Sequence, residues 1–191
     1  LVYAVYRVLN TQYNDQQAKE SLINVLTPGQ TDYQLIYQED QPIQNVNNVV
    51  SLELINDQRY VVIFWAQKNY SWFGDGEQFV SVPYPTTQNG NMDAYDAFTG
   101  IDVVSVDGSI SKNITLVRPF AQLNIATSLP NTNTGRYQDF AVSTTGVKVS
   151  GLASSFNVGT QKGVVENSTV YEVTFRDAEP LTEDFTNASF P

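Results

Sequence analysis

Residues 113–127, which read NITLVRPFAQLNIAT, constrain the fold more than any other segment of this chain. The segment is rich in β-branched and apolar residues, which favour strands over helices. Proline has no backbone N–H to donate, so within a sheet Pro119 is expected at a bulge, a bend or an edge. A strand of this length with one irregularity can pair with one partner before Pro119 and with another after it. The segment therefore predicts a β-sandwich rather than a helical protein.

Other strand-like segments follow one another along the chain, each bounded by turn residues. Residues 1–8 (LVYAVYRV) are apolar on both faces, which predicts a central strand. Residues 49–55 alternate between two faces and are joined by an Asn-Asp-Gln turn to residues 60–67 (YVVIFWAQ). This pair predicts a hairpin whose second strand lies in the middle of a sheet. Further strands are expected at residues 33–38, 79–83, 101–106, 140–149 and 168–175, with turns at Gly146, Gly151, Gly159 and Gly163.

Helical signals are few in this sequence. Residues 92–98 (MDAYDAF) are the candidate for a helical turn, and residues 9–32 are expected to form a polar connection. Together the segments predict one all-β domain over residues 1–176, a sandwich of two sheets with at most one short helical turn. Residues 177–191 (DAEPLTEDFTNASFP) are acidic and contain proline, and they are expected to be a linker or tail toward an absent second domain.

Composition excludes several classes of function. The chain has 191 residues, enough to bury a core, but only 16% of them are charged and the net charge is −10. Nucleic acid is therefore not expected as a partner, because phosphate binding requires a basic surface. The absence of cysteine and histidine excludes disulfides, thiolate metal sites and a Ser-His triad. Neither a cofactor nor a metal ion is expected, and no apolar run is long enough to span a bilayer.

Four carboxylates lie in or near the central loops, at Asp75, Glu77, Asp93 and Asp96. Paired carboxylates can hydrolyse a glycoside or bind calcium through oxygen. The Asp-Gly-Glu sequence at residues 75–77 is too short for a known type of calcium loop. We therefore interpret these carboxylates as solvated surface groups, and we expect the protein not to be an enzyme.

Three aromatic residues beside a Gly-rich turn, Tyr70, Trp72 and Phe73, are the candidate ligand-binding residues. Such rings are enriched among the anchors of binding surfaces, where they stack on sugars or pack against proteins. The alternative is a loop that folds over one end of the sandwich and buries its aromatics. That alternative is favoured, because large exposed apolar patches are rare on monomers.

Arg118 and Pro119 are assigned a structural role. We expect Arg118 to be partly buried and to bond a carboxylate or carbonyl groups at a bulge formed by Pro119. Four Asn-x-Ser/Thr sequences, at Asn69, Asn113, Asn167 and Asn187, would be glycosylated only in a eukaryotic secretory pathway.

Several of these segments, in this order, resemble the fimbrillin-like proteins of Bacteroidetes, which are surface lipoproteins and pilus subunits. The resemblance rests on LVYAVYRV at residues 1–8, YVVIFWAQ at 60–67, MDAYDAF at 92–98 and ITLVRPFAQLNIAT at 114–127. SGLASSFNVGTQKG, at residues 150–163, resembles a turn of the same proteins. The matches together span residues 1 to about 163 and correspond to the N-terminal domain of that family.

The resemblance implies a transthyretin-like Greek-key sandwich, export by a lipoprotein signal and display at the outer membrane, with any lipid anchor outside this chain. In pilus members a protease removes the first strand, and a neighbouring subunit donates a strand into the open groove. Val2, Ala4 and Tyr6 would then be neighbours of that groove. The family's cleavage segment and its second domain are not found in this sequence.

Three classes of function follow from these observations. The first is a structural or adhesive subunit of a fimbria, which pairs through β-strand donation with other subunits or with itself. The second is a monomeric outer-membrane lipoprotein that binds glycans or a host protein through its end loops. The third is a glycosidase, which is the least favoured because no acidic pair stands out.

Overall fold

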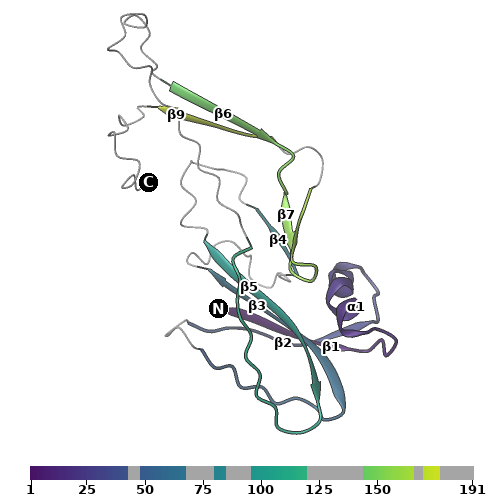
Figure 1. Ribbon diagram of the computed structural model, residues 1–191. Coiled ribbons are helices and arrows are strands. Elements are labelled where there is room, and N and C mark those ends of the chain that lie inside the picture. Colours follow the sequence, from purple (N-terminus) through teal and green to yellow (C-terminus); the bar gives the residue numbers. More distant parts are fainter. Residues whose placement is uncertain (43–47, 68–79, 85–95, 120–143, 166–169, 177–191) are drawn as a thin grey trace, which may run out of the picture.

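The structure is a computed structural model that describes residues 1–42, 48–67, 80–84, 96–119, 144–165 and 170–176 (Figure 1). The strands of the four-stranded sheet are β1 (Val2–Val8), β2 (Tyr33–Asp40), β3 (Gln58–Gln67) and β5 (Ala97–Val106), in the order β2-β1-β3-β5. The three-stranded sheet holds β4 (Ser81–Pro83), β7 (Ser155–Asn157) and β8 (Lys162–Val164), in the order β4-β7-β8. Strands β6 (Thr144–Ser150) and β9 (Val170–Arg176) pair with each other. All these pairs are antiparallel, and the predicted all-β sandwich of two sheets is confirmed.

The two inner strands of the larger sheet, β1 and β3, are buried on both faces. Val5, on one face, and Val61, on the other, are fully buried. Strands of this kind have a continuous hydrophobic sequence, since neither of their faces meets water. The predictions that residues 1–8 and 60–67 form central strands are therefore confirmed.

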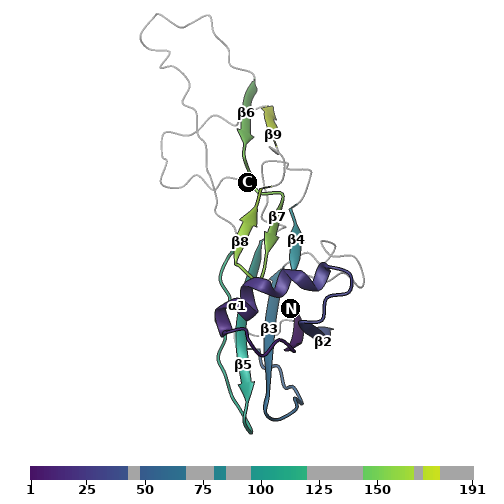
Figure 2. The ribbon, with the colours of Figure 1, turned by 90° about the vertical axis from the view of Figure 1, so that its right-hand side faces the viewer.

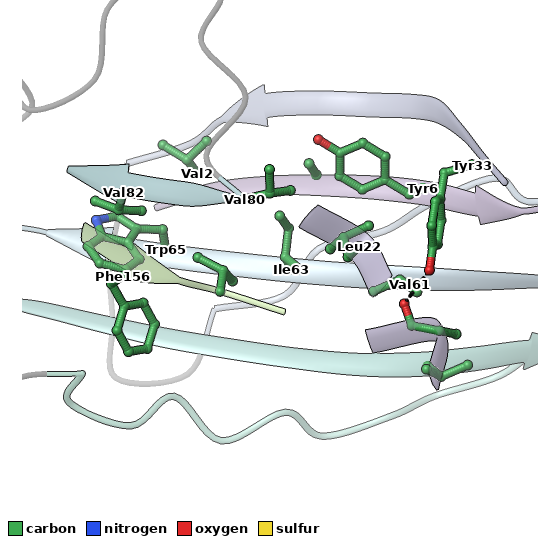
Figure 3. Packing of buried hydrophobic residues seen from close by; sticks show 14 of the residues in the cluster. Val2, Tyr6, Leu22, Tyr33, Val61, Ile63, Trp65, Val80, Val82 and Phe156 are labelled. Carbon is green, nitrogen blue, oxygen red and sulfur yellow. Dashed lines mark hydrogen bonds between the residues drawn. The ribbon is translucent and has the colours of Figure 1, made fainter. Parts of the chain in front are cut away.

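One face of the larger sheet forms the inter-sheet core with the smaller sheet and the helical segment (Figure 3). Trp65 of β3 packs against Phe156 of β7, with 6.1 Å between the ring centroids. Leu22 and Tyr33 fill the other end of the core, where the Tyr33 hydroxyl donates a hydrogen bond of 2.8 Å to the carbonyl oxygen of Ala18. Figure 2, turned by 90°, shows α1 lying across the strands of the larger sheet.

The opposite face is covered by residues 48–55, which form no strand. The hairpin predicted for these residues is therefore wrong. Their alternation is still meaningful: Val50, Leu52 and Leu54 pack against the sheet, whereas Val49 is 82% exposed. Alternating hydrophobicity reports which side chains face a core, and it does not require backbone pairing with a neighbouring strand.

The helical segment also lies elsewhere than predicted. Helix α1 (Asp15–Glu20) continues into the 3-10 helix η1 (Ser21–Leu26), within the expected polar connection. A capping box starts α1: the Asn14 side chain accepts a 2.8 Å bond from the Gln17 N–H, and the Gln17 side chain accepts one of 3.0 Å from the Asn14 N–H. Of the predicted helical turn at 92–98, residues 92–95 lie outside the described residues, and Ala97 and Phe98 begin strand β5.

The long strand predicted for residues 113–127 is wrong in its described half. Residues 113–119 contain a single β-bridge, from Val117 to Thr99, and residues 120–127 lie outside the described residues. Gly146 and Gly163 lie inside strands β6 and β8 rather than in turns. The proposed tail, residues 177–191, also lies outside the described residues.

The Tyr6 hydroxyl gives a first prediction, because it is buried and has no hydrogen-bond partner among the described residues. A buried hydroxyl left without a partner costs about 1 to 3 kcal/mol. We expect Tyr6→Phe, which deletes only that oxygen, to raise the free energy of unfolding by about 1 kcal/mol in urea denaturation at neutral pH. The matched control is Tyr33→Phe, which removes a hydroxyl that is bonded and should destabilise.

The same variant should change the response to alkali. Burial raises the pKa of Tyr6 from 10.0 to about 12. The unfolded chain therefore loses this proton first, and the wild-type protein loses stability as the pH rises from about 10 toward 12. Tyr6→Phe should lose less stability over the same interval. An equal loss in both proteins, or a destabilised variant at neutral pH, would contradict the assignment.

Candidate functional site

The candidate site is the outer edge of β5, the longer of the two edge strands of the four-stranded sheet. On its inner side β5 pairs with β3 along all ten residues, from Ala97 opposite Gln67 to Val106 opposite Gln58. On its outer side the described residues form one β-bridge, in which Thr99 and Val117 exchange two backbone hydrogen bonds of 2.9 Å. One edge of a long strand is thus almost without backbone partners in this part of the chain.

The bridge also shows which backbone groups face outward. In an antiparallel sheet successive residues direct their N–H and C=O groups to opposite sides of the strand. The backbone N–H and C=O of Thr99 bond Val117, on the side away from β3. The backbone N–H and C=O groups of Ile101, Val103 and Ser105 therefore also face away from β3. These residues are the positions at which an added strand would form hydrogen bonds.

Two charged side chains occupy the middle of this edge, at Val103. The Asp102 carboxylate accepts a hydrogen bond of 2.8 Å from the Val103 N–H. The Lys112 ammonium donates one of 3.0 Å to the Val103 carbonyl and lies 2.6 Å from the Asp102 carboxylate. Both outward groups of Val103 are therefore satisfied by an ion pair, a device that opposes uncontrolled strand addition at a sheet edge.

Residues 109–119, which we call the edge strap, run back along β5 after a turn at residues 107–109 (Figure 1). Gly100 of β5 makes room for this segment. A side-chain β-carbon at Gly100 would lie 2.7 Å from Leu116 Cδ2 and 3.1 Å from Ile114 Cγ2, so the strap lies directly on the strand. The strap is held by the Val117 bridge, by Lys112 and by this packing.

The opposite edge of the sheet, formed by β2, is organised differently. The side-chain amide of Gln30 accepts a 3.0 Å bond from the Tyr33 N–H and donates one of 2.9 Å to the Tyr33 carbonyl, which closes one end of the edge. A β-bulge opposite the Val5/Tyr6 step then bends the strand, and bulges hinder edge pairing. Leu35, between these two features, is 42% exposed.

The structure describes only some of the predicted site residues. Tyr70, Trp72 and Phe73, together with Asp75, Glu77 and Asp93, lie outside the described residues. Val2, Ala4 and Tyr6 are buried in the inter-sheet core, on β1. Because β3 separates β1 from β5, these three residues do not line the β5 edge. In the described ranges, no group of three carboxylates forms a metal site.

Arg118 has the carboxylate partner that the sequence suggested. Its guanidinium lies 2.7 Å from Asp96 and stacks over the Phe98 ring at 5.4 Å from the centroid. The Arg118 side chain is 52% exposed. Pro119 lies in no strand, and residues 120–127, which would complete the predicted bulge, lie outside the described residues. The pair fixes the end of the edge strap to the start of β5.

Sequence reasoning missed Asp102 and Lys112, the pair at the centre of the site. A charged residue inside an otherwise apolar strand was the available signal. Its partner ten residues later becomes recognisable only once the chain has turned back at residues 107–109.

No helix in the described part of the chain is long and apolar enough to cross a membrane.

Comparison with known proteins identifies a family but no function. No curated protein and no solved structure matches this chain. A family model described as a family of unknown function, DUF6562, matches residues 6–189. This match spans nearly the whole sequence, and the chain therefore belongs to the DUF6562 family.

Proposed function

We propose that this protein is a non-enzymatic structural subunit of a fimbria-like assembly on the outer surface of a bacterium. The subunit joins its neighbours by main-chain pairing along a sheet edge, with the outer edge of β5 as the acceptor. Its partners are other copies of the chain or related subunits. The resemblance of residues 1–163 to fimbrillin-like proteins supports the cellular setting.

The observation that favours this function is the contrast between the two sides of β5. Ten residues form a complete ladder with β3, whereas one β-bridge is formed on the outer side by the described residues. In β-augmentation an extended segment adds to such an edge, and its backbone hydrogen bonds supply the affinity. A strand added opposite Thr99 to Ser105 would bond the outward backbone groups of Ile101 and Ser105, and it would take the place of Val117 at Thr99 and of the Asp102–Lys112 pair at Val103.

The test compares two proline substitutions, one at each edge of the same sheet. In Ser105→Pro the substitution removes an outward N–H from an exposed position and leaves the ladder to β3 intact. Leu35→Pro makes the corresponding change on β2. We expect the full-length gene product to form multimers, measured by light scattering before and after trypsin treatment. Ser105→Pro should abolish those multimers, and Leu35→Pro should leave them.

Two results would contradict the proposal. A wild-type protein that stays monomeric under all these conditions excludes assembly by strand addition. Multimers that survive Ser105→Pro but are lost in Leu35→Pro would assign the acceptor edge to β2 instead. Far-UV circular dichroism of both variants verifies that each one retains its sheet content.

A further inference from the structure

We propose that the partner at the β5 edge is a second copy of this chain, and that each copy places its edge strap, residues 109–119, on the next copy. Each strap then lies on the β5 edge of that neighbour, with Lys112 of one chain paired with Asp102 of the other, so the exchange can continue from subunit to subunit. This inference rests on the proposed function, because it names the segment that the acceptor edge receives.

The fit between strap and edge is already present within one chain. Val117 exchanges two hydrogen bonds with Thr99, Lys112 bonds both Asp102 and the Val103 carbonyl, and Leu116 fills the space above Gly100. An identical strap from a second copy would form the same contacts. Exchange of an identical element between copies therefore leaves the bonds unchanged, which makes it a low-cost route to an assembly.

The strap is attached lightly enough to exchange. Its described backbone pairing with β5 is one β-bridge, and its other contacts there are the Lys112 ion pair, the packing of Leu116 on Gly100 and the stacking of Arg118 on Phe98. Much of the strap still faces solvent, since Ile110 and Val117 are 44% and 54% exposed. The turn that precedes it contains Gly108, whose φ of 138° is open to glycine and strained for other residues. Glycine can also adopt an extended conformation, in which the chain would not turn at Gly108 and the strap would reach another molecule.

Charge supports a second copy as a specific partner. With a net charge of −10, two copies of this chain repel each other in most orientations. The strap brings a cation, Lys112, to an anion, Asp102, at the contact itself. Complementary charges of this kind select one register and one partner rather than adding much affinity.

The first experiment uses the absence of cysteine from the chain, so that two introduced thiols are the only ones present. Thr99→Cys and Val117→Cys are made in separate proteins, unfolded, mixed, refolded and oxidised. We expect a covalent dimer of one chain of each kind on a non-reducing gel, because the two positions face each other only across the strap. The double variant in one chain reports whether this disulfide can form at all.

A matched control tests whether the strap alone exchanges. Arg59 and Ser105 face each other across β3 and β5, inside one chain. A mixture of Arg59→Cys and Ser105→Cys should give no mixed dimer. If this control mixture cross-links as well, β5 itself or the whole sheet is exchanging, and the strap proposal is wrong.

A charge swap provides a second measurement that does not depend on thiols. Lys112→Asp leaves two acidic residues at the contact, and Asp102→Lys leaves two basic ones, so neither protein can pair with itself. In a mixture each strap finds an opposite charge on the other chain. We expect the mixture to associate about tenfold more tightly than either variant alone, measured by sedimentation velocity.

The outcomes separate this inference from the proposed function. If wild-type multimers form, but the thiols introduced at positions 99 and 117 do not join two chains and the charge-swap mixture is not rescued, strap exchange is overturned. Strand addition, the proposed function, is left in place by that result. A protein that never associates would overturn both proposals. Cross-linking together with rescue would support both.

Discussion

Replacing Trp65 with alanine is expected to lower the free energy of unfolding by about 3 to 5 kcal/mol, the usual effect of truncating a buried aromatic residue. Trp65 is fully buried on the central strand β3 and meets Phe156 of the facing sheet. Its loss opens a cavity between the two sheets. The indole N–H also donates a 2.7 Å bond to the Gln67 side chain, whose carbonyl oxygen would lose that donor.

The measurement is guanidinium denaturation followed by far-UV circular dichroism. The control is Val49→Ala, a truncation at a position that is 82% exposed, which should change stability by less than about 0.5 kcal/mol. If Trp65→Ala does not fold, Trp65→Phe, which keeps most of the ring volume, should fold and be less stable than wild type. A Trp65→Ala protein as stable as wild type would show that the two sheets do not share this core.

Gly159→Ala is expected to be the second strongly destabilising change, by about 1 to 3 kcal/mol from overpacking. Gly159 follows β7 and lies against the end of helix α1. A β-carbon here would overlap the carbonyl oxygen of Lys19 and would lie 3.4 Å from Leu22 Cβ. Because the obstacle is backbone, no side-chain rotation relieves the overlap, and the helix must move off the sheet.

Gly29 is the matched control, since it is required for a different reason. Its φ is +79°, and an added β-carbon would meet no atom within 4 Å. Asparagine tolerates this left-handed conformation, so Gly29→Asn should be nearly neutral, whereas Gly159→Asn should be at least as harmful as Gly159→Ala. Thermal unfolding of these variants separates the two roles. Equal effects at both positions would contradict close packing of Gly159 on the helix.

The parts of the fold that could be predicted are those in which the local pattern has one physical meaning. Residues 1–8 and 60–67 are apolar on both faces, and only a strand covered on both sides uses such a sequence. Residues 49–55 show the limit of this reasoning. Their period of two correctly identified the side chains that face the sheet, but an extended segment can pack without forming a ladder.

The helix was missed because its sequence is short and polar. Asn14 and Gln17, three residues apart, were the available signal for a helix start. A helix of six residues gains little from its own hydrogen bonds, and the stability of the helical segment comes from burying Ala18 of α1 and Leu22 of η1 against the sheet. That burial depends on elements far away in the sequence.

Composition and periodicity were enough to establish the all-β class, the positions of the two central strands, and a chain without histidine or cysteine chemistry. Each of these properties can be read along a single segment, because it depends on residue type and spacing alone. The open edge of the sheet, and the groups that protect it, emerge only in the folded chain. Asp102 and Lys112 meet at Val103 because the chain reverses at residues 107–109, and such contacts depend on three-dimensional proximity rather than on any local pattern.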